Sequence, residues 1–374
     1  MKQFRTGLGV LALATLVGCG EKASDPAVEN EAAAVVEVTA EAPVEVKVVV
    51  VSMFEIGEDI GDTAGEFQLW KERAGLNTHY DFPQSFHDLY MNSETGVLGM
   101  VTGMGTAKST AAIMALGLDP RFDLSNAYWL VAGIAGFDPA DGSIGSAAWA
   151  EYLVDGDFGH EIDAREMPED WETGFIPLFT KEPYQKPNPM NQGEMFHING
   201  DLAQWAFDLT KDLPLPDDDK IAEMRSEYSA FPNAQKPPFV MLGDNLAGMT
   251  FWHGELMNDW ANKWVDYWSE GEGEFVSSGM EDTGTAQALF YLDRAGFADY
   301  DRLMVLRTAS NFTMPVEEGQ TAAESLTGEG EDYAGLGLAL EVAYQVGSTV
   351  VEEITSNWDT YKTAIPSTEG SSDE

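Results

Sequence analysis

The sequence predicts an α/β fold, with a central twisted sheet, mostly parallel or mixed, that is flanked by helices. Short runs of apolar, largely β-branched residues recur without polar alternation, which is typical of strands buried on both faces. Helical patterns lie between several of these runs, and strands that alternate with helices indicate this fold class. Hydrophobic residues make up 44% of the 374 positions and charged residues 22%, a balance that favours a folded core.

Six segments are expected to form buried strands. Val48–Val51 is the clearest, because four consecutive β-branched residues suit a strand that is covered on both faces. The other candidates are apolar runs at Val97–Thr102, Ala127–Ala132, Phe239–Leu242, Phe275–Ser278 and Leu303–Leu306. Helices are expected at about Thr106–Leu116, Asp201–Lys211, Thr285–Ala295 and Leu336–Trp358, and one further helix should carry Trp252, Trp260, Trp264 and Trp268 on one face.

The first residues have the pattern of a targeting segment. Two basic residues precede an uncharged stretch over 7–18, which is shorter than the roughly 20 residues of a spanning helix and has the length of a signal-peptide core. Small residues then precede Cys19, which resembles the bacterial lipobox. We therefore expect loss of residues 1–18 and a lipid on Cys19 at the periplasmic side of the cell envelope. Gly20 instead of Asp favours the outer membrane, and the alternative is an ordinary signal peptide beside an unrelated cysteine.

The rest of the chain divides by composition. Residues 19–46 are rich in Ala, Val and Glu and predict an acidic, flexible tether, because like charges repel and no turn or core signal occurs. The folded domain is expected over 47–365. Frequent prolines over about 167–238 predict a long, irregular insertion at one edge of it. Residues 366–374 are polar and are expected to be a disordered tail.

The composition disfavours several classes of partner and site. Lys and Arg number 20 against 64 Asp and Glu, and the resulting net charge of −44 argues against nucleic acid and against an anionic lipid surface. A single cysteine allows neither an internal disulfide nor a thiolate metal site, and the five histidines lack metal-site spacing. We expect no metal and no cofactor, and contact with the membrane through the N-terminal lipid only. The acidity is interpreted as a solvated surface for salty surroundings.

Candidate chemistry lies just after each predicted strand, because ligands of open α/β sheets bind outside the carboxyl ends of the strands. Two glycine-rich turns are present, but such turns are more often structural than ligand-binding, and they match neither a Walker loop nor a dinucleotide fingerprint. The segments are Ser52–Glu55, Thr102–Ser109, Ala132–Gly136, Gly243–Asn245, Gly279–Asp282 and Arg307–Asn311.

Taken in this order, these segments resemble the purine nucleoside phosphorylase superfamily, which includes nucleosidases, and more closely the purine nucleoside permease family. The second resemblance rests on Leu130–Gly136, Ile162–Pro168, Trp171–Pro177 and Leu306–Phe312. It extends over residues 47–358. It implies a three-layer nucleoside-phosphorylase-like fold that includes the proline-rich insertion, with a purine nucleoside as the ligand.

The resemblance also implies roles for particular residues. Met280 and Glu281 match a Met-Glu pair whose carboxylate accepts hydrogen bonds from the ribose hydroxyls, and an acceptor-only group suits a diol. From the sequence alone, Glu281 could equally be a charge that stabilises a helix N-terminus. Asn311 occupies the position of the group that contacts the purine, and an amide there favours inosine or guanosine. Glu55 lies near the residue that orients the attacking water, although its alignment is uncertain by one residue.

Five further positions complete the implied site. Asp244, in a Gly-Asp pair at a strand end, is expected to contact the base. Gly103, Gly105, Ala132 and Gly133 are expected to form loops in which the backbone approaches the ligand closely.

Two positions bear on the reaction. Val131 and Ile134 stand where hexameric phosphorylases place an Arg and a Ser that bind phosphate, and Lys108 and Ser109 are not matched substitutes. Without a cation a phosphate dianion would be poorly held, so hydrolysis of the N-glycosidic bond for nucleoside salvage is favoured over phosphorolysis. The alternatives are a non-catalytic nucleoside-binding component that delivers nucleoside to a transporter partner and a purely structural lipoprotein. A homo-oligomer stays open.

Overall fold

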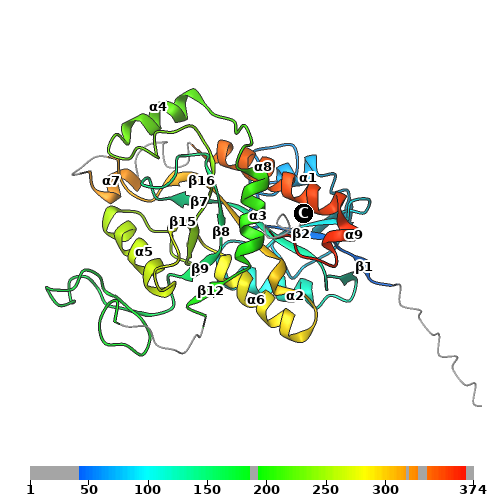
Figure 1. Ribbon diagram of the computed structural model, residues 1–374, viewed down its shortest axis with the longest axis horizontal. Coiled ribbons are helices and arrows are strands. Elements are labelled where there is room, and N and C mark those ends of the chain that lie inside the picture. Colours follow the sequence, from blue (N-terminus) through cyan, green and yellow to red (C-terminus); the bar gives the residue numbers. More distant parts are fainter. Residues whose placement is uncertain (1–41, 186–192, 317–319, 327–334, 368–374) are drawn as a thin grey trace, which may run out of the picture. The chain divides into compact units, whose positions relative to one another are not determined.

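A mixed sheet of twelve strands runs through the described residues of the computed structural model, which are 42–185, 193–316, 320–326 and 335–367 (Figure 1). Nine strands follow one another in the order β12-β9-β14-β15-β7-β2-β5-β4-β3, and β16, β8 and β13 join the sheet from the other edge of β7. The strands are β2 (Val48–Ser52), β3 (Thr78–Tyr80), β4 (Leu89–Asn92), β5 (Val97–Val101), β7 (Tyr128–Phe137), β8 (Ala147–Ala150), β9 (Tyr152–Asp155), β12 (Met195–His197), β13 (Val240–Leu242), β14 (Asp244–Ala247), β15 (Phe275–Gly279) and β16 (Leu303–Phe312).

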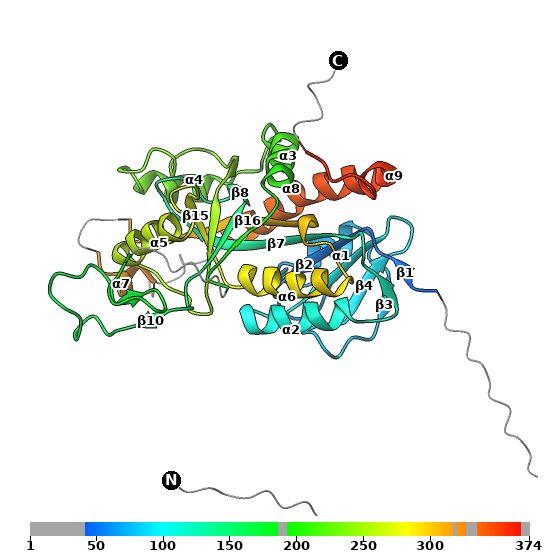
Figure 2. The same ribbon diagram turned by 60° about the horizontal axis from the view of Figure 1, so that its bottom comes forward.

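Helices cover both faces of this sheet and give three layers. The bounds are α1 (Gln68–Arg73), α2 (Thr106–Gly117), α3 (Gly200–Thr210), α4 (Asp219–Glu227), α5 (Glu255–Trp268), α6 (Asp282–Ala295), α7 (Ala322–Leu326), α8 (Leu336–Ser356) and α9 (Trp358–Tyr361), with a 3₁₀ turn at Tyr300–Arg302. Figure 2 shows α2 and α6 on one side of the sheet and α3, α8 and α9 on the other. The expected three-layer α/β fold is therefore confirmed.

Strand β2 shows why its sequence has no polar alternation. The side chains of Val49 and Val51 belong to the core that includes Ile113 of α2 and Leu289 of α6. Val48 and Val50 point to the opposite face, into the core that α8 covers. Both faces of the strand are completely buried, so β-branched residues are favoured at every position.

The two long strands β7 and β16 pair in parallel over most of their length, and this pairing occupies one edge of β7. The other edge is shared by two shorter strands. Strand β2 pairs in parallel as far as Val51 with Val131, and β15 pairs in the antiparallel direction, with Ser278 opposite Gly136. The carboxyl ends of β2 and β15 therefore point toward each other. Between them a stretch of the β7 edge is left without a neighbouring strand.

The predicted elements agree with this topology apart from their ends. All six predicted strands are present, but β7 and β16 run five and six residues further than predicted. The four predicted helices are present within a few residues. Trp252 was wrongly placed on a helix with the other tryptophans, because α5 begins only at Glu255; its ring instead contacts Trp260 edge-on at 6.3 Å.

Two boundaries also need correction. The end of the predicted tether is part of the fold, since β1 (Val44–Glu45) pairs with β6 (Phe122–Asp123). The proline-rich segment over 167–238 is less irregular than expected. It contains α3, α4, the edge strand β12 and the strand β11 (Phe175–Ile176). Strand β11 pairs with β10 (His160–Glu161), which precedes the segment. The segments 1–18 and 368–374, with Cys19, lie outside the described residues.

Candidate active site

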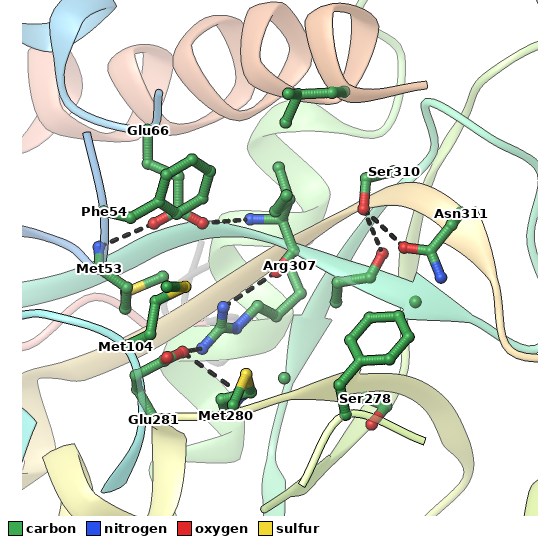
Figure 3. Close-up of a pocket in the computed structure, with 16 residues that line it drawn as sticks. Met53, Phe54, Glu66, Met104, Ser278, Met280, Glu281, Arg307, Ser310 and Asn311 are labelled. Atoms are coloured by element: carbon green, nitrogen blue, oxygen red, sulfur yellow. Dashed lines mark hydrogen bonds and ion pairs between the residues drawn. The ribbon is translucent and has the colours of Figure 1, made fainter. Parts of the chain in front are cut away.

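The uncovered stretch of the β7 edge forms the floor of a cavity of about 340 Å³. Met53, just after β2, and Gly279, the last residue of β15, line it from either side of the gap. Its volume lies within the range of small-molecule sites. Figure 3 shows Glu66 and Glu281 on one side of the Arg307 guanidinium, and Ser310 and Asn311 on the other. The cavity therefore has a carboxylate end and an amide end.

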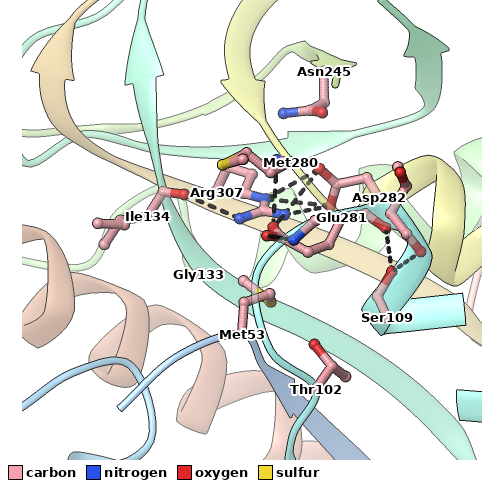
Figure 4. A network of polar contacts seen from close by, with 12 residues as sticks. Met53, Thr102, Ser109, Gly133, Ile134, Asn245, Met280, Glu281, Asp282 and Arg307 are labelled. Carbon is pink, nitrogen blue, oxygen red and sulfur yellow. Dashed lines mark hydrogen bonds and ion pairs between the residues drawn. The ribbon is translucent and has the colours of Figure 1, made fainter. Parts of the chain in front are cut away.

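Arg307 of β16 connects the elements that meet below this cavity (Figure 4). Its Nη1 atom donates to the carbonyl of Ile134 at 3.0 Å and so satisfies a backbone group in the strand gap. Its Nη2 and Nε atoms bond both Asp282 oxygens at 3.0–3.2 Å, and Nη2 also contacts Glu281 Oε2 at 2.9 Å. Burial lowers the pKa of Arg307, but the carboxylates of Asp282, Glu281 and Glu66 outweigh it and raise this pKa overall. The guanidinium is therefore a fixed charge.

Glu281 joins two segments that are far apart in sequence. Its Oε1 accepts from the Gly105 N–H at 2.8 Å, just before α2, and its backbone carbonyl accepts from Ser109 Oγ at 3.2 Å. Oε2 accepts from Arg307 and, at 3.3 Å, from the Met280 N–H. Oε1 thus keeps one lone pair for a ligand. Burial raises the pKa of Glu281 overall, although Arg307 and the Gly105 N–H partly oppose this rise.

Glu66 is a second buried carboxyl group at the same end. Its Oε2 accepts from the Met53 N–H at 2.7 Å and its Oε1 from the Ile134 N–H at 2.8 Å. The second of these bonds satisfies another backbone group of the strand gap. Burial raises the pKa of Glu66 to about 8, and Glu281 adds to this rise, whereas Arg307 and the two N–H groups oppose it. Glu66 therefore changes its charge near neutral pH.

The opposite end of the cavity is built from the end of β16. Ser310 Oγ donates to Asn311 Oδ1 at 2.9 Å, and Asn311 Nδ2 donates to the Phe312 carbonyl at 3.1 Å. These bonds fix the orientation of the Asn311 amide, which keeps one N–H and one lone pair for a ligand. Phe251 and Leu336 add apolar surface, so a flat ring with a polar edge fits this end.

The predicted close-approach positions differ from expectation. Gly103 and Gly105 precede α2 with φ of 85° and 100°, where side chains are disfavoured, so this turn needs glycine. Ala132 and Gly133 were expected in a loop but lie within β7, which continues to Phe137. A Cβ on Gly133 would clash with Met53 and lie 2.7 Å from Glu66 Oε1. This glycine therefore leaves space for the carboxyl group.

Glu55, the expected water-orienting residue, does not line the cavity. Its carboxylate instead accepts hydrogen bonds from the N–H groups of Ile56, Gly65, Phe67 and Gln68, and it closes the loop between β2 and α1. All four lone-pair sites of the carboxylate are used. The acid of this connection that lines the cavity is Glu66, which the sequence analysis did not identify.

Asp244, the expected contact of the base, also lies elsewhere. It is the first residue of β14, and its register partner is Phe275 at the start of β15, the strand whose opposite end lines the cavity. Its carboxylate accepts from the N–H groups of Glu151, Tyr152 and Glu274 at 2.7–2.9 Å. Asp244 therefore joins three strands of the sheet and is not part of the cavity.

The charges of the cavity oppose a phosphate. Among the described residues that line it, the ionisable groups are Glu66, Glu281 and Arg307, and the guanidinium is already bonded to Glu281 and Asp282. Ile134 lines the floor as an apolar residue, and Ser109 is buried against Glu281. One group of described side chains could converge on a cation, His79 with Asp81 and Asp88, but it is mostly exposed and does not line this cavity.

The sequence analysis identified Met280, Glu281 and Asn311, which all line the cavity, and missed Glu66 and Phe251; Phe54 and Met104 lie in two of its candidate segments but were given no role. Glu66 follows no motif, and in a chain with 64 acidic residues nothing local distinguishes it. Phe54, Met104 and Phe251 come from three separate loops, so only the folded chain brings them together.

A comparison with protein families agrees with the motifs. The purine nucleoside permease family matches residues 45–366, which is most of the chain. This chain belongs to that family. A purine nucleoside permease of Candida albicans is 28% identical over 317 residues, covering 84% of this chain and 76% of that protein. A probable purine nucleoside permease of Schizosaccharomyces pombe is 28% identical over 294 residues, covering 76% of this chain and 81% of that protein.

Solved structures of nucleosidases show a more distant similarity to this permease family member. A Helicobacter pylori MTAN with 5′-methylthioadenosine in its active site is 16% identical, with a TM-score of 0.49. The match covers 82% of this chain and 98% of the MTAN chain. The futalosine hydrolase of the same organism is 14% identical, with a TM-score of 0.48.

Proposed function

We propose that this permease family member binds a purine nucleoside in the cavity between β2 and β15, with the ribose at Glu281 and the base at Asn311. The observation that carries the proposal is the separation of two kinds of polar group along one cavity. At the carboxylate end, Glu281 offers an acceptor to each of two ribose hydroxyls. One hydroxyl can donate to the free lone pair of Oε1, and the other can donate to Oε2 in place of the long hydrogen bond from the Met280 N–H. The amide end offers one donor and one acceptor, as the edge of a 6-oxopurine such as inosine or guanosine requires.

Glu66 extends this proposal to catalysis. Its ionised carboxylate would accept a proton from a water molecule as the water oxygen bonds to C1′ of the ribose. The bond from C1′ to N9 breaks, and its electron pair leaves with the purine, which takes up a proton from solvent and accepts a hydrogen bond from Asn311; Glu66 then returns its proton to solvent. The products are ribose and the free base. The neighbouring carboxylates of Glu66 and Glu281 would stabilise the positive charge that develops on the sugar.

Water is favoured over phosphate as the nucleophile. A phosphate dianion beside Glu66 and Glu281 would meet two carboxyl groups, and the guanidinium of Arg307 is held by Asp282 and Glu281. No lysine or second arginine lines the cavity among the described residues. Water carries no charge and does not meet this repulsion.

The names of the relatives favour a second candidate function, a nucleoside-binding component of an uptake system that carries out no reaction. Among the described residues, no helix is both long and apolar enough to cross a membrane. In this reading the same cavity holds the nucleoside, and a separate transporter moves it. For either function we propose a periplasmic location with a lipid on Cys19, which mass spectrometry of the mature N-terminus would test.

Incubation of the purified protein with inosine, with and without phosphate, tests the proposal. Hydrolysis predicts hypoxanthine and ribose in equal amounts at a rate that phosphate does not raise. Product that forms only with phosphate, as ribose 1-phosphate, would contradict the choice of water. Binding of inosine without any product would favour the uptake component.

A further inference from the structure

Asp282 is a buried charge that takes no part in the proposed chemistry. It is the first residue of α6, directly follows Glu281, and does not line the cavity. Both oxygens of its carboxylate lie 3.0–3.2 Å from the Nε and Nη2 atoms of Arg307, and neither side chain is more than 2% exposed (Figure 4). Asp282 and Arg307 therefore form an ion pair beneath the carboxylate end of the cavity.

Two glycines leave space for this ion pair. A Cβ on Gly279, the last residue of β15, would lie 2.7 Å from Asp282 Oδ2 and 2.8 Å from Arg307 Cζ. A Cβ on Gly133 of β7 would lie 2.9 Å from Arg307 Nη1, so the pair packs directly against the backbone of both strands. A buried ion pair is often no more stabilising than an apolar pair of the same size. Stability alone therefore does not account for these two charges.

The Arg307 guanidinium has five N–H groups, and its contacts divide them. Asp282 accepts one from Nε and one from Nη2, Glu281 accepts the other from Nη2, and the Ile134 carbonyl accepts one from Nη1. Without the Asp282 carboxylate, Nε and Nη2 would lose their acceptor. Because an arginine binds a carboxylate best through two parallel hydrogen bonds, Arg307 would then take both oxygens of Glu281. The ribose would lose the free lone pair of Glu281 Oε1.

The same ion pair determines the charge that Glu66 meets. The charged groups that face Glu66 are Arg307 of β16 and Glu281 before α6, which are the other ionisable groups among the described residues that line the cavity. The positive charge of Arg307 lowers the pKa of Glu66, and the negative charge of Asp282 beside it offsets part of this effect. Loss of the Asp282 charge should therefore keep Glu66 ionised to a lower pH.

We propose that Asp282 is a positioning residue of the nucleoside site: it holds Arg307 so that Glu281 stays free for the ribose, and it offsets the charge that Arg307 presents to Glu66. This inference rests on the proposed function, because it needs the ribose at Glu281. It assigns a role to a residue that touches neither the nucleoside nor the attacking water. Both carboxyl groups of the cavity then depend on the Asp282–Arg307 pair.

Asp282→Asn tests this role, since the amide keeps the size of the side chain and one acceptor oxygen but loses the charge. Calorimetric titration should show that inosine binds about fivefold more weakly than to wild type. Carbon-13 NMR of labelled glutamate carboxyl groups, with Glu66→Gln to assign the signal, should show the titration midpoint of Glu66 about one pH unit lower. A purely structural role for Asp282 would change neither quantity in the folded protein.

Two further variants separate the effect of charge from an effect on folding. Asp244→Asn removes a buried charge at the other end of the sheet and should leave both quantities near their wild-type values. The double variant Asp282→Asn/Arg307→Gln removes both charges of the pair, which costs less than leaving one of them unpaired, so it also serves if the single variant does not fold. In the double variant the Glu66 midpoint should lie at or above the wild-type value, and a lower midpoint would contradict the role of Asp282.

Thermal unfolding shows which variants are folded at the titration temperature. A folded Asp282→Asn protein with wild-type affinity for inosine and an unchanged Glu66 midpoint would overturn this inference and leave the proposed function standing. Wild-type protein that binds no inosine would overturn the proposed function and this inference together.

Discussion

Glu55 and Glu66 belong to the same connection between β2 and α1, and both are buried, yet they differ in what surrounds them. Glu55 accepts four backbone N–H groups from its own loop, which satisfies its carboxylate completely. Glu66 accepts only two, one of them from the open edge of β7, and lines the cavity. Glu55 therefore stabilises the loop, while Glu66 keeps lone pairs for a ligand.

The same contrast separates Asp244 from Glu281 at opposite ends of the sheet. Each accepts three N–H groups, but those of Asp244 all come from backbone and join strands, whereas Glu281 accepts from Gly105, Met280 and the Arg307 guanidinium and lines the cavity. A buried carboxylate whose hydrogen-bonding capacity is filled by backbone serves the fold. One with capacity left inside a cavity is a candidate for binding.

The largest expected effect is that of Glu66→Gln on hydrolysis. The amide keeps the size of the side chain but cannot take a proton from water, so kcat should fall by about 10²–10⁴-fold. Initial rates of hypoxanthine release measure it. Glu55→Gln is the matched control, and its rate per folded molecule should stay within a few-fold of wild type. Equal losses in both variants would remove the distinction between the two residues.

Glu55→Ala should mainly affect stability. Four N–H groups lose their acceptor, and the free energy of unfolding should fall by about 3 kcal/mol, since water can reach some of them. Urea denaturation measures this change. Glu341→Gln, which breaks an exposed pair with Arg73, is the control and should have little effect. A stable Glu55→Ala protein would show that the loop does not depend on this carboxylate.

The pH dependence should reveal Glu66. Its pKa is raised to about 8, so the ionised base becomes scarcer below that value, and the rate should fall about tenfold for each pH unit. The effect of Glu66 on stability has the opposite sign to that of an acid whose pKa is lowered by an ion pair. Between its ordinary pKa and about 8, the native state holds a proton that the unfolded state has lost, so Glu66 makes the free energy of unfolding decrease as pH rises. A rate without this rise toward pH 8 would contradict the assignment.

The smallest expected effect is that of Asn311→Asp on the preference between purine bases. Asn311→Asp replaces an amide that can both donate and accept with a carboxylate that repels a 6-oxo group. The ratio of affinities for inosine and adenosine should shift toward adenosine by roughly tenfold. An equal loss for both nucleosides would assign Asn311 to folding instead.

The fold could be predicted largely from the sequence, because burial leaves a local signal. Four consecutive valines at Val48–Val51 indicate a strand with two covered faces, and the structure buries all four. The ends of the strands could be predicted less well from the sequence. The second half of β7 has the sequence of a glycine-rich turn, but it is a strand because β16 pairs along it and β15 pairs with its last two residues.

The candidate site could be predicted only where a motif marks it. Met280, Glu281 and Asn311 are adjacent to strand ends and match the family pattern, and all three line the cavity. Glu66 could not be found, because its importance comes from the gap between β2 and β15, which depends on pairing across distant parts of the chain. Asp244 had a suitable motif but lies at the start of its strand, and only the strand directions reveal this.

Titration of inosine into wild-type protein and Glu281→Ala tests the central claim most directly. The substitution removes the charged acceptor of the ribose hydroxyls, and the affinity should weaken by about 2–3 kcal/mol, or roughly 30- to 150-fold. Thermal unfolding of the variant confirms that it is folded at the titration temperature. A folded Glu281→Ala protein that binds inosine as tightly as wild type would contradict the placement of a nucleoside in this cavity.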